Sequence, residues 1–207
     1  DVRIDYSQSP DGRKNATEMN YWAKDNPSLR LEWAMPSDAD IIAGQIAPYR
    51  EQLADADAIV FVGGTDHNLD CEGRDRTSMQ FPQGQTELIR QVSAINGKTI
   101  VVLMHGAPID LPWIDRVPAV LDMFFPGMEG GTAMADILFG DADPSGRLTF
   151  SWPERLEDSP VYELATQDVD NVNYEDSLMV GYRYFDTKRV TPRYEFGYGL
   201  SYTTFDY

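Results

Sequence analysis

The fold is decided by one stretch, Ala58-Ile59-Val60-Phe61-Val62-Gly63-Gly64, in which an unbroken apolar run leads directly into two glycines. A strand that is apolar at successive positions is typical of a parallel sheet, which is buried on both faces. The glycines let the backbone turn sharply where the strand ends. We therefore expect a buried parallel strand here. Ligands of open α/β sheets gather beyond the carboxyl ends of the strands, so the loop that follows is the first place to look for function.

Helical and strand-like segments alternate on both sides of this stretch. Ser37 and Asp38 can cap a helix that runs to about Ala54. The pattern then predicts a helix near Gln85–Ala94, a strand Thr99–Met104, a short helix around Trp113, a strand near Ala119–Phe124 and a helix from about Gly130 to Phe139, closed by Gly140. This order predicts an α/β domain with a mainly parallel sheet sandwiched by helices.

The two ends of the chain have a different character. Val2–Tyr6 and Leu29–Trp33 alternate apolar and polar residues, as half-buried antiparallel strands do. Two strands alone are marginal in water, so we expect them to belong to a sheet whose other strands lie elsewhere. Beyond Asp141 the chain is rich in Pro, Gly and aromatic residues, and runs such as Val180–Phe185 are interpreted as loops and edge strands without a helix.

Composition excludes several classes of function. The 207 residues carry a net charge of −17, which would repel nucleic acid and anionic membranes. A single cysteine and two histidines have no metal-ligand spacing, so no structural metal is expected. No apolar run approaches the roughly 20 residues of a membrane span, and no signal peptide is visible at the N-terminus.

The loop after the first buried strand carries most of the ionisable groups. Between Gly63 and Arg76 it holds carboxylates and arginines, namely Asp66, Asp70, Glu72, Asp75, Arg74 and Arg76. Carboxylates beside arginines are usually structural ion pairs with lowered pKa. A loop at this place is also a suitable site for a general acid/base. Both interpretations stay open at this point.

Other side chains favour structural interpretations. Cys71 is treated as a packing residue, and His105 as a hydrogen-bonded histidine that lines a turn. The aromatic residues near the C-terminus indicate a packed edge or a domain interface more than a sugar-stacking surface. No dinucleotide or phosphate-loop motif occurs, and Ser145 lacks the context of a nucleophilic serine.

A series of ordered strings nevertheless identifies a family resemblance over residues 58–207. They are Glu72-Gly73-Arg74-Asp75-Arg76, Phe81-Pro82, Thr99–Leu103, Ala107-Pro108-Ile109, Phe125-Pro126-Gly127-Met128-Glu129-Gly130-Gly131, Pro144-Ser145-Gly146-Arg147-Leu148, Ser151-Trp152-Pro153, Val180–Asp186 and Glu195–Phe205. Together they resemble the C-terminal α/β domain of family 3 glycoside hydrolases, notably the β-glucosidases.

The resemblance implies a retaining, exo-acting β-glucosidase that hydrolyses terminal non-reducing β-D-glucosyl residues. Its general acid/base maps onto Glu72, with Asp70 as the runner-up, and Asp75 and Arg76 look like residues that position the loop. No cofactor and no metal is implied. The substrate class is a β-glucoside or cello-oligosaccharide, the implied location is extracellular or periplasmic, and homo-oligomerisation is left open.

One departure from the family is serious. The family's nucleophile is an aspartate in a Ser-Asp-Trp string on a separate N-terminal barrel, and here Ser37-Asp38 is followed by Ala39. The resemblance thus implies a barrel partner, and the chain alone is expected to be inactive. It assigns residues 1–36 to the last strands of a protective-antigen-type β-sandwich insert. Residues 37–196 become the later part of an incomplete six-stranded α/β sandwich, and residues 197–207 a junction toward a fibronectin type III-like domain.

Two other functions remain as alternatives. A β-xylosidase or another exo-β-glycosidase of the same family would have a similar acid/base loop. A non-catalytic carbohydrate-binding or scaffolding domain could keep the fold, and it would lose nothing when Glu72 is changed.

Overall fold

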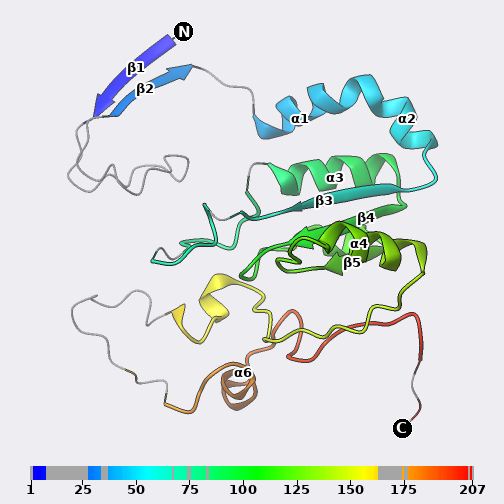
Figure 1. Ribbon diagram of the computed structural model, residues 1–207. Helices are drawn as coiled ribbons and strands as arrows, with labels where there is room; N and C mark the ends of the chain where they lie inside the picture. The colour runs from blue at the N-terminus through cyan, green and yellow to red at the C-terminus, as the bar shows by residue number, and fades with distance from the viewer. Residues whose placement is uncertain are drawn as a thin grey trace.

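The computed structural model describes residues 2–7, 28–33, 37–66, 68–73, 76–82, 84–162, 174, 177–204 and 206, and for the first two ranges the backbone alone. Figure 1 shows a layered arrangement in which helices lie above a central sheet and the C-terminal part of the chain lies below it. Among all the residues that the structure describes, no helix is both long and apolar enough to cross a membrane.

The central sheet is parallel, as the sequence predicts. Its strands lie in the order β3 (Ile59–Gly64), β4 (Thr99–Met104), β5 (Ala119–Asp122). The prediction for the last strand is two residues too long, because Phe124 has a left-handed φ of 50° that ends the extended backbone. The α/β class is confirmed, and the larger six-stranded sandwich stays a prediction.

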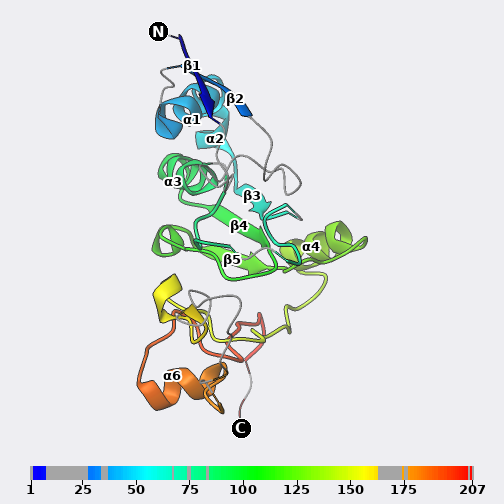
Figure 2. The same cartoon turned by 90° about the vertical axis from the view of Figure 1, so that its left-hand side faces the viewer.

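Helices cover both faces of the sheet. Figure 2 shows α3 (Gln85–Ile95) and α4 (Gly130–Phe139) on opposite sides of the strands. The helix predicted over residues 38–54 forms as α1 (Asp38–Ile46), a 3-10 turn η1 (Ala47–Tyr49) and α2 (Arg50–Asp55). The turn contains Pro48, which has no N–H for the helical ladder. Short 3-10 turns η2 (Ile114–Arg116) and η3 (Leu156–Asp158) follow later.

The main core lies between the sheet and α3. Phe61, Val101 and Leu103 of the strands pack there with Ile89 of α3 and with the fully buried Trp113. A second, smaller cluster of Ile42, Ile46 and Val92 joins α1 to α3. Burial of each such side chain contributes roughly 1.5 to 3 kcal/mol.

The C-terminal part of the chain is fastened to this core by a tryptophan. The Trp152 ring is buried, and its indole N–H donates to the Ile109 carbonyl oxygen at 3.0 Å. Its backbone pairs with Tyr194 in an isolated antiparallel bridge, which fits the expected edge pairing. The expectation that this region lacks helix is wrong, because α6 (Tyr182–Lys188) forms after Gly181, whose φ is 58°. The aromatic residues of this segment favour a strand, and a helix of about two turns is too short to show a clear helical period.

The two N-terminal strands also form. β1 (Val2–Ser7) pairs antiparallel with β2 (Ser28–Trp33), with Val2 opposite Trp33. Their membership of a β-sandwich insert, and the domain boundaries at residues 36 and 196, remain predictions.

Candidate functional site

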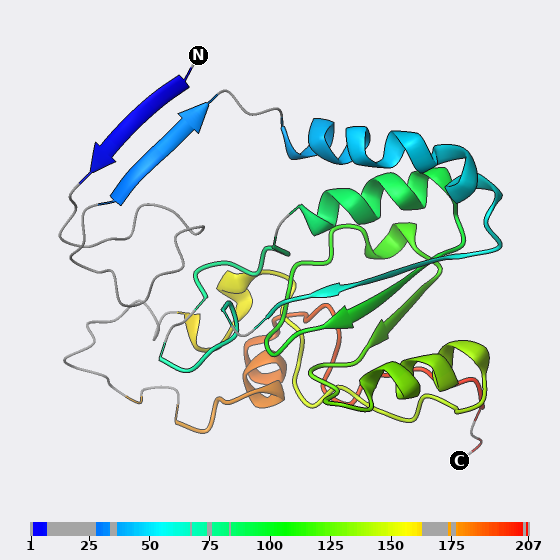
Figure 3. The same cartoon turned by 45° about the horizontal axis from the view of Figure 1, so that its top comes forward.

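The candidate site lies where the three parallel strands end. Figure 3 shows the arrowheads of β3, β4 and β5 pointing to the same edge, where the segments that follow β3 and β4 run alongside each other. We call residues 65–76 the acid/base loop and residues 105–108 the supporting segment. In chain order the acid/base loop follows β3 and the supporting segment follows β4.

A side chain from α3 holds the end of β3 in place. Gln85 donates through Nε2 to the Gly64 carbonyl at 2.9 Å, and its Oε1 accepts the Gly64 N–H at 2.9 Å. The amide thus pairs with the backbone as a neighbouring strand would. Gly64 itself is required by close packing, because a Cβ there would lie 1.6 Å from the Met104 carbonyl oxygen. The start of the acid/base loop is therefore fixed.

Asp70 is the anchor of the loop. Its side chain is 8% exposed, and its carboxylate accepts hydrogen bonds from the Thr65 hydroxyl and from the Gly106 amide, the latter at 2.9 Å. Arg76 Nη1 lies 3.4 Å from its other oxygen. Burial alone would raise the pKa of Asp70, but the donors Thr65, Gly106 and Arg76 outweigh it and hold the pKa below the ordinary 3.8.

Arg76 ties the loop to the supporting segment. Besides Asp70, its Nη1 donates to the carbonyl oxygens of Ala107 at 3.4 Å and Pro108 at 3.3 Å. That Arg76 positions the loop stays a prediction; the side-chain partner that the structure gives it is Asp70. Asp75, the other predicted positioning residue, lies outside the described residues, as does Arg74.

Glu72 stands apart from this network. It lies two residues after the anchor, in a turn where Gly73 has a φ of 76°, and its side chain is exposed. Within the described parts of the chain it forms no hydrogen bond or ion pair. The two carboxylates thus differ in their surroundings: Asp70 is surrounded by hydrogen-bond donors, whereas Glu72 is exposed.

Some sequence expectations around the loop are corrected or extended. Cys71 is exposed, so its interpretation as a packing residue is wrong. His105 is hydrogen-bonded as expected, with Nδ1 3.0 Å from the Ala107 carbonyl oxygen. Sequence reasoning missed Thr65 and Gly106. A hydroxyl at the strand end was a usable signal, but nothing in the sequence indicates which amide would meet Asp70.

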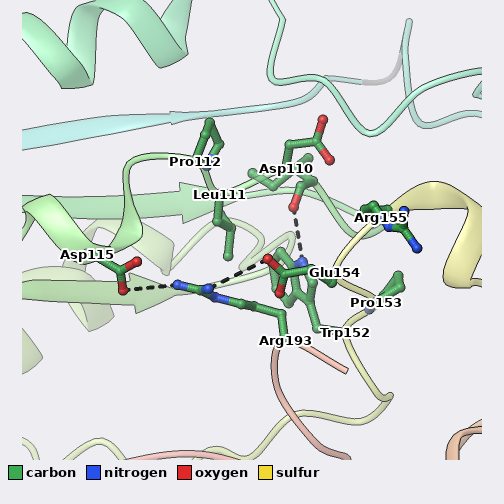
Figure 4. Close-up of a pocket in the computed structure, with 10 residues that line it drawn as sticks. Asp110, Leu111, Pro112, Asp115, Trp152, Pro153, Glu154, Arg155 and Arg193 are labelled. Atoms are coloured by element: carbon green, nitrogen blue, oxygen red, sulfur yellow. Dashed lines mark hydrogen bonds and ion pairs between the residues drawn. The ribbon is translucent and has the colours of Figure 1, made fainter. Parts of the chain in front are cut away.

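A hollow lies beside the supporting segment. It has a volume of about 450 Å³ and is lined by Asp110, Asp115, Trp152, Glu154 and Arg193, among others (Figure 4). Arg193 lies 3.1 Å from Asp115 and 3.7 Å from Glu154. Burial raises the pKa of Asp110 against the opposing charge of Arg76. The arginine is already satisfied by its own neighbours, so the hollow offers a weaker site than the loop.

The described residues give no indication of a metal centre. Within them, no group of three or more His, Cys, Asp or Glu side chains is placed to hold an ion.

Comparison with known proteins identifies the family. A β-glucosidase of Bacteroides ovatus (BoGH3A) is 40% identical over 163 residues, which are 76% of this chain and 22% of that protein. Thermostable β-glucosidase B of Acetivibrio thermocellus is 44% identical over 150 residues, 72% of this chain and 20% of that protein. The chain thus spans about a fifth of the length of these curated relatives.

Solved structures agree with this result. The β-glucosidase of Kluyveromyces marxianus in complex with glucose matches 87% of this chain and 21% of its own, with a TM-score of 0.75 and 34% identity. DesR, a β-glucosidase of Streptomyces venezuelae in complex with D-glucose, matches 86% and 22%, with a TM-score of 0.71 and 36% identity. Residues 3–202 match the family described as the glycosyl hydrolase family 3 C-terminal domain. The chain therefore belongs to glycosyl hydrolase family 3 and matches the C-terminal domain of its β-glucosidases.

Proposed function

We propose that this chain supplies the general acid/base, Glu72, of a retaining exo-acting β-glucosidase whose nucleophilic aspartate comes from a barrel domain. The observation that carries the proposal is the difference in surroundings between the two carboxylates of the acid/base loop. Asp70 is buried, paired and held ionised, whereas Glu72 is exposed on an anchored turn two residues later. An ionised, fully paired carboxylate cannot donate a proton, so Asp70 is the weaker candidate.

The reaction proceeds by two displacements. In the first, the aspartate attacks the anomeric carbon while the Glu72 carboxylic acid protonates the departing glycosidic oxygen. In the second, the Glu72 carboxylate removes a proton from water, which attacks the glycosyl-enzyme bond and releases the sugar. Such a mechanism places the two carboxyl groups about 5 to 5.5 Å apart. The substrate class, a terminal β-glucoside, is supported by the glucose complexes of the similar K. marxianus and S. venezuelae enzymes.

The test is the substitution Glu72→Gln in the polypeptide that carries this chain together with the barrel. Loss of the acid should slow hydrolysis of cellobiose, a poor leaving group, by about a hundredfold or more. Release of dinitrophenolate needs no protonation, so glycosylation by dinitrophenyl β-glucoside should be much less affected. Azide should then accept the sugar and give a β-glucosyl azide, because its attack needs no base.

Two matched variants and a second substrate complete the design. Asp66→Asn changes a carboxylate of the same loop that accepts from the backbone and side-chain amides of Asn68 at 2.9 and 3.3 Å, and it should show neither effect. If Asp70→Asn, and not Glu72→Gln, yields the azide product, the assignment of Glu72 is wrong. Faster turnover of an aryl β-xyloside than of the aryl β-glucoside would replace glucosidase by xylosidase, and a Glu72→Gln variant with full activity would point to a non-catalytic domain.

A further inference from the structure

A buried histidine and a partly buried aspartate lie at the strand ends that carry the site. His105 is the first residue after β4, and Asp122 is the last residue of β5. The His105 side chain is fully buried. Its Nε2 lies 3.1 Å from Oδ1 of Asp122, and its Nδ1 lies 3.0 Å from the Ala107 carbonyl oxygen.

Both ring nitrogens of His105 face oxygen atoms that accept hydrogen bonds, one on the supporting segment and one on β5. The contact of Nε2 with Asp122 is within ion-pair distance but lacks hydrogen-bond alignment, and Nε2 and Asp122 Oδ2 have no hydrogen-bond partner within the described residues.

Packing shields this pair and fixes its place. The rings of Phe124 and Trp152 lie 5.5 and 5.0 Å from the imidazole, measured between centroids. Phe124 has the left-handed φ of 50°. Its backbone N–H donates to Asp122 Oδ1 at 3.2 Å, and its carbonyl oxygen accepts the backbone N–H of His105 at 3.2 Å. Such strained residues persist where their surroundings over-determine them, often at functional sites.

The pair reaches the acid/base loop through one carbonyl group. The Ala107 oxygen that faces His105 Nδ1 also accepts from Arg76 at 3.4 Å, and Arg76 in turn contacts Asp70. Gly106, between His105 and Ala107, donates its N–H to Asp70 at 2.9 Å. Every contact that anchors Asp70 from the supporting segment thus depends on where His105 holds residues 106 and 107.

We infer that His105 and Asp122 are positioning residues for the acid/base reaction, acting through the Ala107 carbonyl and Arg76 on the turn that carries Glu72. A buried ion pair contributes little more stability than apolar residues of the same size. Apolar residues in place of His105 and Asp122 would not orient the supporting segment, because they could not hydrogen-bond to the Ala107 carbonyl. The inference rests on the proposed role of Glu72.

The decisive variant is Asp122→Asn in the polypeptide that contains both this chain and the barrel. It keeps the volume but replaces the carboxylate that faces Nε2 of His105 with a neutral amide, so the contact between the two side chains weakens. Of the two contacts of the imidazole ring, the one with Asp122 is then weakened, and the ring holds the Ala107 carbonyl less firmly. We expect kcat/KM for cellobiose to fall by about ten- to a hundredfold, as small misplacements of catalytic groups do. For dinitrophenyl β-glucoside kcat/KM, which reports glycosylation alone, should fall less than about threefold, because its leaving group needs no acid.

A control on the same strand separates positioning from general damage. Thr99 is fully buried at the opposite end of β4, where its hydroxyl donates to the Asn96 carbonyl oxygen at 2.7 Å. Thr99→Val should lower stability without any leaving-group dependence. Hydrogen exchange gives a second readout: amides of residues 65–76 should exchange faster in Asp122→Asn and not in Thr99→Val. His105→Gln should act as Asp122→Asn does, and where it reduces the yield of folded protein, the nearly isosteric Asp122→Asn still gives the answer.

Glu72→Gln, measured in parallel, distinguishes failure of the inference from failure of the proposed function. If Glu72→Gln shows the leaving-group dependence while Asp122→Asn slows both substrates equally, the positioning role is overturned and the role of Glu72 stands. If Glu72→Gln itself slows both substrates equally, Glu72 is not the acid and the inference falls with it.

Discussion

Two carboxylates in the same loop illustrate how surroundings decide a residue's role. Asp70 and Glu72 are separated by one residue and carry the same functional group. Thr65, Gly106 and Arg76 surround the first, whereas the second is exposed and unpaired within the described part of the chain. A structural carboxylate needs donors around it; a proton donor in catalysis needs to be free of them.

The anchor predicts a specific pH dependence of stability. Because the pKa of Asp70 is lower in the folded protein than its ordinary 3.8, the folded state favours the carboxylate. Its stabilisation is complete above the ordinary value and is lost as the pH falls toward the lowered one. Asp70→Asn should cost about 2 kcal/mol of unfolding free energy at pH 7, and the difference from wild type should shrink near pH 3. Urea unfolding at both pH values measures this.

A surface carboxylate provides the comparison. Two hydrogen bonds from Arg90, each 2.7 Å long, hold the pKa of Glu87 at about 2. This pair lies on the outside of α3, where solvent and salt screen it. Glu87→Gln should therefore change stability far less than Asp70→Asn, and added salt should abolish its effect. A salt-sensitive Asp70→Asn difference of the same size as Glu87→Gln would contradict the anchoring role.

At the scale of elements, the site depends on how β3 is fixed at its end. Gln85 begins α3 and pairs with both backbone groups of Gly64, which joins a helix to the strand that carries the acid/base loop. Loop positions are thus set by an element some twenty residues away, because the two partners are 21 positions apart in sequence.

Gln85→Leu should loosen that junction. It leaves the N–H and carbonyl of Gly64 without their partner, which costs about 1 to 2 kcal/mol of unfolding free energy. Thermal or urea unfolding gives the stability, and hydrogen exchange at Gly64 and Thr65 gives the local effect. Gln45→Leu, on the exposed side of α1, is the matched control and should stay within about 0.5 kcal/mol of wild type. Equal losses in the two variants would show that the amide pair contributes nothing.

The elements also show what the sequence can and cannot predict. Apolar runs over residues 58–62 and 99–104 predicted both strands correctly, and β4 is buried as such a run indicates. The expected burial of β3 is wrong: Phe61 is buried, but Val60 and Val62 on its other face are exposed. The helix Tyr182–Lys188 was missed because its aromatic residues favour strand and it spans too few turns for a period. Within the site, ordered motifs led to Glu72 and Arg76. The partnership of Asp70 with the Gly106 amide depends on tertiary packing, which no local pattern encodes.

At the scale of the molecule, several apolar side chains are exposed on and around the sheet. Val60 and Val62 of β3 are 45% and 44% exposed, and Phe139 of α4 is 85% exposed. When this many apolar side chains are exposed on one chain, another domain or subunit usually covers them in the assembled protein. The chain also spans only about a fifth of the length of its curated relatives.

The chain produced alone should therefore self-associate and should not hydrolyse an aryl β-glucoside. The reason is twofold: exposed apolar side chains favour association, and the proposed nucleophile lies on the barrel. Sedimentation velocity and a hydrolysis assay test both points, with the barrel-containing polypeptide as the active reference. A monomeric 23.3 kDa chain that cleaves the substrate would show that the proposed division of the active site is wrong.

The anchored base and free tip of the acid/base loop also bear on how such a site can be altered. Thr65, Asp70 and Arg76 hold the base, whereas the turn at Glu72 and Gly73 projects beyond those contacts. Side chains at the tip can thus be exchanged without disturbing the fastening below. Libraries directed at Cys71, which is exposed next to Glu72, should reshape the surroundings of the departing group while the scaffold stays intact, so substrate preference and fold can be diversified separately.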